Sequence, residues 1–189
     1  QRVIFDYEDI RREPHAIVVN RINAYLVDGP DVAIGKRSVP LCSVPEMKFG
    51  NQPIDGGHLI LDPDERRDIL AMCPQAENWI RPFLGATEFI NAEERYCIWL
   101  VGVSPAEIRS AQPVYERIQK VREFRLASDR PATRELANNP SDFAFVSHPD
   151  TNYLLVPSVS SERRAYVPIG FMPPSAVASN LCLIVPRAT

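Results

Sequence analysis

Proline limits the architecture of this chain more than any other residue, because it occurs 18 times in 189 residues and is spread along the whole length. Each proline fixes the backbone φ angle and removes an amide donor, so it interrupts helices and central strands. The chain also has only eight glycines, which makes a dinucleotide-binding fold with a glycine-rich loop hard to accommodate. The sequence therefore predicts short elements joined by many loops.

The bulk composition is that of an ordinary soluble globular protein, with 45% hydrophobic and 24% charged residues. The length is sufficient for one buried core, no apolar run is long enough to span a bilayer, and the charged N-terminus does not resemble a signal peptide. Four widely spaced cysteines without a C-x-x-C pair favour reduced thiols over a metal site or a disulfide scaffold. We expect a single cytoplasmic domain over residues 1–189, taken from a longer polypeptide.

Local patterns predict four helical regions in the middle of the chain. Acidic residues open residues 62–73, and Ser104-Pro105-Ala106-Glu107 is a capping box with proline at the first helical position. Pro113 should break or restart that helix. Apolar residues at helical spacing then predict an amphipathic helix over 114–125, with a basic outer surface, and residues 131–136 add a short helix.

Apolar and β-branched runs predict strands in the rest of the chain. The expected extended segments are 16–19, 24–27, 59–61, 96–101, 143–146, 153–156, 165–167 and 182–185. Together with the helices they indicate an α+β fold, in which a mostly antiparallel sheet is combined with a few short helices.

Charge is distributed unevenly along the chain. The net charge of −3 gives no support to a uniformly basic nucleic-acid-binding domain. However, residues 62–94 hold eight acidic and three basic side chains, whereas residues 95–135 hold eight basic and five acidic ones. Residues 157–189 add three arginines against one glutamate. These two basic segments could bind phosphates, or they could simply form a solvated helix face with i,i+4 ion pairs.

Asp55-Gly56-Gly57-His58 is the string most typical of an enzyme. Asp55 and His58 could share a metal or act as an acid–base pair, with His148 and Asp150 as partners. This arrangement would make the chain a small hydrolase or metalloenzyme domain. The two glycines and the nearby proline also describe a tight turn before a strand. Neither a G-x-S-x-G elbow nor a phosphate-binding glycine loop occurs.

A polar string lies between two expected strands and has a different chemistry. It consists of Ser160, Ser161, Glu162, Arg163 and Arg164. Arginine can donate to guanine O6 and N7, glutamate can accept from cytosine N4, and serine can do either. The string therefore suits the reading of base edges, although a hairpin turn with a Glu–Arg ion pair would use the same residues.

Several sequence blocks in a fixed order resemble one family. They are PEMKFGNQPIDGG at 45–57, IRPFLG at 80–85, the segment 117–125, and SSERR at 160–164 followed by YVPIGF at 166–171. This series is similar to the target recognition domain of MmeI-like DNA methyltransferases, which are large type II restriction–modification enzymes and their methylase relatives. The resemblance covers residues 5–189.

The resemblance implies a loop-rich module that recognises a double-stranded DNA sequence, while a separate domain of the same polypeptide flips the target adenine and methylates its N6 with S-adenosylmethionine. The catalytic Asn-Pro-Pro-aromatic motif of such enzymes is absent here, since Asn139-Pro140-Ser141 does not match it. We therefore expect neither a catalytic residue, nor a metal, nor a cofactor site in this segment. Its partners would be duplex DNA and the methyltransferase domain.

Two groups of residues are assigned to DNA on this basis. We expect phosphate contacts from Lys120, Arg122, Arg125, Arg130 and Arg134, and a groove-facing loop formed by Ser160, Ser161, Glu162, Arg163 and Arg164. Residues 140–156 and 172–180 are alternative base readers. A pure interaction module, which docks the methylase to other subunits and has no affinity for DNA, is the remaining alternative.

Overall fold

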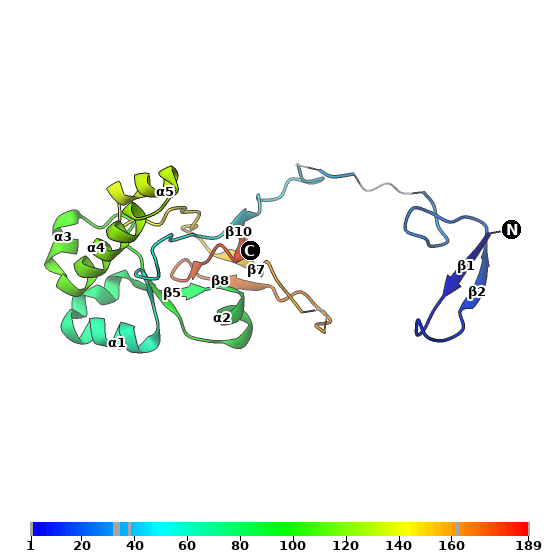
Figure 1. Ribbon diagram of the computed structural model, residues 1–189, viewed down its shortest axis with the longest axis horizontal. Coiled ribbons are helices and arrows are strands. Elements are labelled where there is room, and N and C mark those ends of the chain that lie inside the picture. Colours follow the sequence, from blue (N-terminus) through cyan, green and yellow to red (C-terminus); the bar gives the residue numbers. More distant parts are fainter. Residues whose placement is uncertain (1, 32–34, 38, 162, 189) are drawn as a thin grey trace. The chain divides into compact units, whose positions relative to one another are not determined.

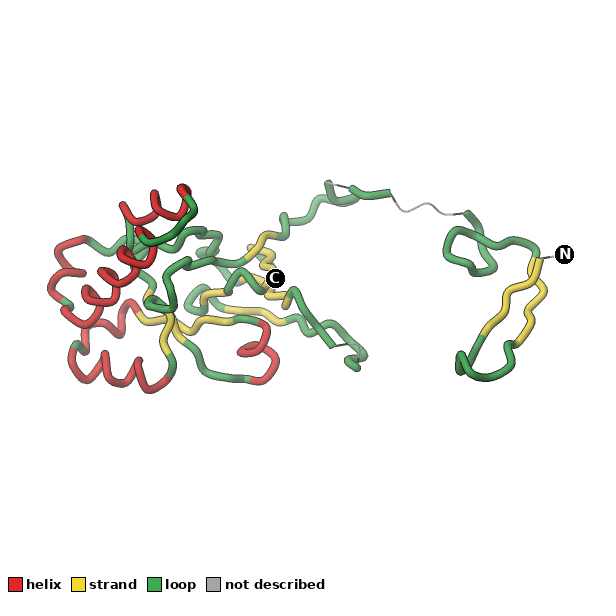
Figure 2. Tube along the Cα trace, viewed as in Figure 1, coloured by secondary structure: helices red, strands yellow, loops and turns green. Residues whose placement is uncertain are grey.

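The computed structural model describes residues 2–31, 35–37, 39–161 and 163–188. The chain divides into two compact units, Gln1–Val44 and Pro45–Thr189, which we call unit 1 and unit 2. Figure 1 shows their elements along the chain, and Figure 2 distinguishes helices from strands.

Unit 1 contains one antiparallel hairpin, formed by β1 (Arg2–Asp6) and β2 (His15–Val19). Residues 24–27 were expected to be extended but form a turn. The side chain of Asn23 explains this turn, because its Oδ1 accepts from the amides of Tyr25 at 2.9 Å and Val27 at 3.3 Å. Local capture of amides by an asparagine side chain competes with strand pairing.

Unit 2 contains two four-stranded sheets among the described residues. The first has the order β3-β10-β7-β8 and is antiparallel throughout; the second has the order β4-β6-β5-β9 and ends in a parallel pair, β5 with β9. The strands are β3 (Lys48–Phe49), β4 (Ile60–Leu61), β5 (Ile80–Leu84), β6 (Tyr96–Ile98), β7 (Tyr153–Pro157), β8 (Gly170–Met172), β9 (Val177–Ala178) and β10 (Cys182–Pro186). The predicted α+β class with a mostly antiparallel sheet is confirmed.

The helices of unit 2 gather largely on one side of it, opposite β7, β8 and β10 (Figure 1). They are α1 (Pro63–Met72), α2 (Ala86–Asn91), α3 (Pro105–Ser110), α4 (Gln112–Leu126) and α5 (Pro131–Glu135), with 3₁₀ turns at Pro74–Trp79 and Leu136–Asn138. Both predicted helix starts are confirmed: Asp62 and Ser104 each accept from the amide three residues later, and each has proline at the first turn. Pro113 lies in the first turn of α4, so it restarts the helix.

Two clusters of buried side chains hold unit 2 together. The larger one packs α1, α3 and α4 against β4, β5 and β6, and Val114, Ile118 and Val121 provide the buried stripe of α4. The smaller one lies under the β3-β10-β7-β8 sheet and includes Tyr153, Leu155, Ala178, Cys182 and Ile184. Three of the four free cysteines are buried, and Cys42 is exposed.

Asn51 joins the two sheets of unit 2. It is fully buried, its amide and its side-chain Nδ2 both donate to the Ala178 carbonyl, and its Oδ1 accepts from the amide of Ser147 at 2.8 Å. The preceding Gly50 approaches the same chain so closely that a Cβ would overlap the carbonyl oxygens of Ala178 and Ser179. The close packing of Gly50 against Ala178 and Ser179, at the end of β9, therefore requires a glycine at position 50.

Two further strand predictions are wrong. Residues 143–146 form only an isolated bridge, Phe145 with Gln52, and the ladder ends because Asn51 takes the next available amide, that of Ser147. Residues 165–167 lie in a loop, and β8 begins only at Gly170, after Pro168. The expected strand 96–101 is shorter than predicted, since β6 ends at Ile98.

Candidate nucleic-acid interface

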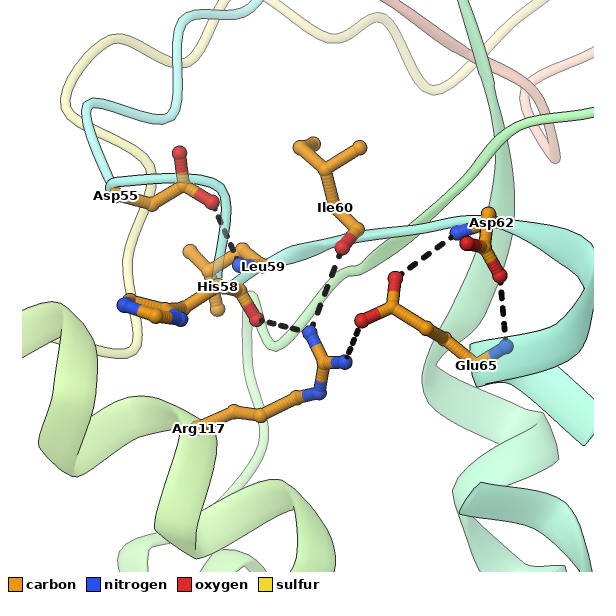
Figure 3. Close-up of polar contacts among 7 residues, drawn as sticks. All are labelled: Asp55, His58, Leu59, Ile60, Asp62, Glu65 and Arg117. Carbon is orange, nitrogen blue, oxygen red and sulfur yellow. Dashed lines mark hydrogen bonds and ion pairs between the residues drawn. The ribbon is translucent and has the colours of Figure 1, made fainter. Parts of the chain in front are cut away.

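The Asp55–His58 segment is a structural turn. Gly56 and Gly57 adopt φ angles of 67° and 87°, and the buried carboxylate of Asp55 accepts from the amide of Leu59 at 2.6 Å. Figure 3 shows this carboxylate directed at the Leu59 amide, while the His58 ring does not face it. The Asp55 carboxylate therefore closes the turn before β4, and no acid–base pair is formed.

His148 does not complete a metal site with these residues. Its Nε2 lies 2.7 Å from the carbonyl oxygen of Pro174, and its ring packs edge-on against Trp99 and Tyr153. Burial lowers the pKa of His148, the Pro174 contact opposes this shift, and Arg81 adds to it. No group of three or more metal-ligating side chains occurs in the described part of the chain. The geometry thus gives no support to the hydrolase or metalloenzyme alternative.

Arg117 links α4 to the Asp55 turn and to α1. Its guanidinium donates to the carbonyl of His58 at 3.1 Å and forms an ion pair with Glu65, the residue that completes the capping box of Asp62 (Figure 3). Arg117 is largely buried by these contacts. The charge of Arg117 stabilises the packing of α4 on α1, and little of the guanidinium is accessible to a ligand.

Arg125 corrects the predicted phosphate contacts. It is fully buried, and its three nitrogens donate to five backbone carbonyls at 2.7–2.9 Å. The accepting residues are Pro53, Ile54, Leu136, Asn139 and Asp142. Burial lowers the pKa of Arg125, and the carboxylates of Asp55 and Asp142 partly restore it. A guanidinium with every edge occupied cannot bind a phosphate, so Arg125 belongs to the core and not to the interface.

The other four predicted phosphate ligands are exposed. Lys120 and Arg122 lie on α4, Arg130 directly precedes α5, and Arg134 lies in its last turn. Lys120 and Arg122 are two residues apart on a helix and so point in different directions. Arg130 and Arg134 are four apart, and Arg134 also donates to the Ser128 carbonyl at 2.8 Å. Within the described residues none of the four forms an ion pair. They do not converge on one point.

The residues predicted to read bases lie in the loop 158–169 between β7 and β8, which we call the recognition loop. It extends beyond the sheet as a long hairpin (Figures 1 and 2). Ser158 fixes its base, because its amide and hydroxyl donate to the Leu181 carbonyl at 3.1 and 2.6 Å. Near the tip, Ser161 accepts from the amides of Arg163 and Arg164.

The recognition loop presents its polar side chains to solvent. Ser160, Ser161, Arg163 and Arg164 are all exposed, and the predicted Glu162 lies outside the described residues. A hollow of about 270 Å³ separates Ser160, Ser161 and Arg164 from the start of α2. The loop is thus a projection with two exposed arginine side chains, which is an arrangement that can enter a groove of a duplex.

Sequence reasoning missed the apolar side chains of the same loop. Tyr166 is 87% exposed, and Val159, Val167 and Ile169 are more than half exposed. Tyr166 was assigned to a strand because it lies in the apolar triplet Ala165-Tyr166-Val167. The two arginines before this triplet and Pro168 after it could have indicated a loop instead.

Comparisons with known proteins identify the family of this chain. A family model described as MmeI, target recognition domain, matches residues 28–189. DNA methyltransferase A of Bacillus subtilis (strain 168) is 36% identical over 169 residues, which are 89% of this chain and 19% of that protein.

A solved structure of the type IIL restriction–modification enzyme MmeI in complex with DNA is also similar. It matches with a TM-score of 0.82 and 42% identity, over 99% of this chain and 25% of that chain. The chain therefore spans a quarter or less of the length of these relatives. No helix in the described residues is long and apolar enough to cross a membrane.

Proposed function

The chain belongs to the MmeI target recognition domain family, and from this membership we propose that it recognises a specific sequence in double-stranded DNA on behalf of a larger DNA methyltransferase polypeptide. The observation that carries the proposal is the recognition loop, whose Arg163 and Arg164 are exposed on a projection of unit 2. In a protein–DNA interface, contacts to phosphates fix the position and contacts to base edges supply the specificity.

The two groups of polar residues divide these tasks. Ser160, Ser161, Arg163 and Arg164 would read base edges, because arginine and serine provide the donors and acceptors that distinguish base pairs in the major groove. Lys120, Arg122, Arg130 and Arg134 would contact phosphates, since they are exposed and unpaired within the described residues. Glu162 remains a proposed reader without a structural description.

Methyl transfer would take place on another domain. We propose that this domain acts on adenine N6, that it holds S-adenosylmethionine, and that the enzyme works in the cytoplasm. Asn139-Pro140-Ser141 does not fit a catalytic role, because the Asn139 carbonyl accepts from Arg125 at 2.9 Å and from the Asp142 amide at 3.2 Å. This string is a structural turn, and the cofactor would be bound outside this chain.

A matched pair of double variants tests the proposal. Arg163→Ala/Arg164→Ala removes two neighbouring arginines from the recognition loop, and Arg11→Ala/Arg12→Ala removes two exposed neighbours from unit 1. The affinity of the chain for a labelled duplex of mixed sequence is measured by fluorescence anisotropy at several salt concentrations. On a duplex of mixed sequence the loop has no target bases to read, so its two guanidinium groups would contact phosphates instead, as in non-specific binding generally. We therefore expect the loop variant to weaken binding about tenfold or more and to flatten the salt slope by nearly two units, about 0.9 for each lost contact.

The control variant should bind like the wild type. Equal binding of both variants, or a wild-type affinity that does not change with salt, would contradict the proposal. The absence of any DNA affinity, in the chain and in the intact polypeptide, would favour the pure interaction module.

A further inference from the structure

The outer face of the β3-β10-β7-β8 sheet is apolar throughout. Residues directly opposite one another in antiparallel strands point to the same face. Leu183 is opposite both Phe49 and Val156, while Leu154 is opposite both Val185 and Phe171. These six side chains, which we call the outer apolar face, are Phe49, Leu154, Val156, Phe171, Leu183 and Val185.

The rest of unit 2 leaves the two edges of this face exposed and its centre partly exposed. Phe49 and Phe171 are each 61% exposed, and the other four side chains are half-buried. The smaller core cluster lies on the opposite side of the sheet, and none of the six belongs to it. An antiparallel sheet with one solvated face normally alternates apolar and polar residues, and this sheet has no polar residue among the six. A continuous apolar surface of this kind is typical of an interaction site.

A hollow lies at each edge of the outer apolar face, beside Phe171 and beside Phe49, and could receive side chains of a partner. One of about 470 Å³ is lined by Phe171 with Thr151, Asn152, Arg187 and Ala188. Another of about 410 Å³ is lined by Phe49 with Gly50, Gln52, Phe145 and Asn180. Exposed aromatic anchors beside hollows are the usual centres of protein–protein interfaces. The six side chains offer no hydrogen-bond donor to a phosphate, so DNA does not fit this face.

We propose that the outer apolar face docks against the catalytic methyltransferase domain of the same polypeptide. This proposal rests on the proposed function. The first and last strands of unit 2, β3 and β10, are neighbours in this sheet, so polypeptide joined to either end of unit 2 is tethered beside the face. The relatives are four to five times longer than the matched region, which leaves ample polypeptide for such a domain. Tethering gives an effective concentration in the millimolar range, which favours this occupant over a second copy. The two faces of unit 2 would then separate the tasks, with the recognition loop on DNA and the sheet on the catalytic domain.

Hydroxyl-radical footprinting of the intact methyltransferase polypeptide tests the proposal directly, because it measures the accessibility of individual side chains. The oxidation rate of each phenylalanine is divided by its rate in the urea-denatured polypeptide. Phe124 on α4, which is 44% exposed, is the internal reference. The proposal requires Phe49 and Phe171 to be protected about tenfold more than Phe124, without DNA and independently of protein concentration.

Unit 1 is also joined to unit 2 beside β3, so the 189-residue chain alone is footprinted as well. Four outcomes would overturn the proposal: protection no greater than that of Phe124, protection lost on hundredfold dilution, which would indicate a second copy, protection that requires DNA, and equal protection in the 189-residue chain alone, which would indicate unit 1. A double variant supplies a second measurement. Phe49→Asp/Phe171→Asp should keep the fluorescence of buried Trp99 but lower the rate of methyl transfer about tenfold. Met72→Asp, at an exposed position at the end of α1, should leave the rate of methyl transfer unchanged. A folded double variant with the wild-type rate would also count against docking. Failure of the proposed function would appear instead as DNA binding that is insensitive to Arg163 and Arg164, whatever the footprint.

Discussion

Replacing Arg125 distinguishes a core arginine from a DNA-binding one. Arg125→Met keeps much of the length and apolar character of the side chain but removes all five hydrogen bonds to the carbonyls of the 53–54 and 136–142 segments. Arg125→Lys keeps the charge, yet an ammonium has three donors and cannot satisfy five carbonyls. Arg122→Lys and Arg122→Met, on the exposed side of the same helix, are the matched controls.

The expected loss of stability follows from these contacts. A buried polar group left without a partner costs about 1–3 kcal/mol. In Arg125→Met the carbonyls of Pro53, Leu136 and Asn139 keep a backbone amide as donor, whereas those of Ile54 and Asp142 lose their partner. Two such carbonyls cost about 2–6 kcal/mol. That value is a large part of the 5–15 kcal/mol that stabilises a typical domain. Arg125→Lys should lose about half as much, and the Arg122 variants should stay within about 0.5 kcal/mol of the wild type.

Urea unfolding followed by the fluorescence of buried Trp99 measures these differences in unit 2. If Arg125 were a phosphate ligand, Arg125→Lys would be nearly as stable as the wild type and would change mainly the DNA affinity. A free energy of unfolding for Arg125→Met within about 1 kcal/mol of the wild type would refute the assignment of Arg125 to the core.

Three further predictions concern the stability of unit 2. Gly50→Ala should cost about 1–3 kcal/mol in urea unfolding, because its Cβ meets backbone carbonyls that cannot rotate away. Asp62→Ala should cost about 1 kcal/mol by removing the cap of α1, and Asp64→Ala, which loses an exposed ion pair, should cost less. The pKa of His148 is lowered in the folded state, so near and below the usual histidine pKa the unfolded chain binds more protons than the folded one. The free energy of unfolding should therefore decrease as the pH is lowered from 7 to 5. Thermal unfolding at each pH should show a weaker decrease in His148→Phe. A steeper loss in His148→Phe than in the wild type would contradict the last of these.

The parts of the fold that could be predicted from the sequence depend on neighbouring residues. The starts of α1 and α3 were correct because a cap and its partner are three residues apart. The parts that could not be predicted depend on distant ones. Arg125 satisfies carbonyls up to 72 positions away, and nothing in its helical spacing distinguishes it from exposed Arg122. The failed strand at 143–146 has the same cause, because Asn51 captures the amide of Ser147 from 96 positions away. The failed strand at 24–27 has a local cause instead, since Asn23 captures the amides of Tyr25 and Val27.

For the candidate site, the polar string at 160–164 could be placed in a loop because apolar segments flank it. The length of that loop could not be predicted. The apolar triplet at 165–167 is indistinguishable from a strand by composition. Only the pairing of β7 with Gly170–Met172 shows that the loop continues to residue 169. The outer apolar face was equally inaccessible, since it depends on the register of four strands that are up to 134 residues apart in the sequence.

The structure also sets an upper limit to the electrostatic contribution of the two basic segments. Of the eight basic residues in 95–135, Arg125 is buried, Arg95 pairs with Glu88, and Arg117 pairs with Glu65. The five that stay available are Arg109, Lys120, Arg122, Arg130 and Arg134. With Arg163, Arg164 and Arg187 they make eight, so even if all of them contacted phosphates, the logarithm of the binding constant would fall with the logarithm of the salt concentration by no more than about 7. Because Lys120 and Arg122 point in different directions, we expect a slope of only about 3 to 4, measured by anisotropy on a mixed-sequence duplex. A slope steeper than about 7 would show that residues outside these two segments bind the backbone. A slope in the expected range leaves most of the affinity of a complete enzyme to its other domains, and the recognition loop then contributes chiefly the choice of sequence.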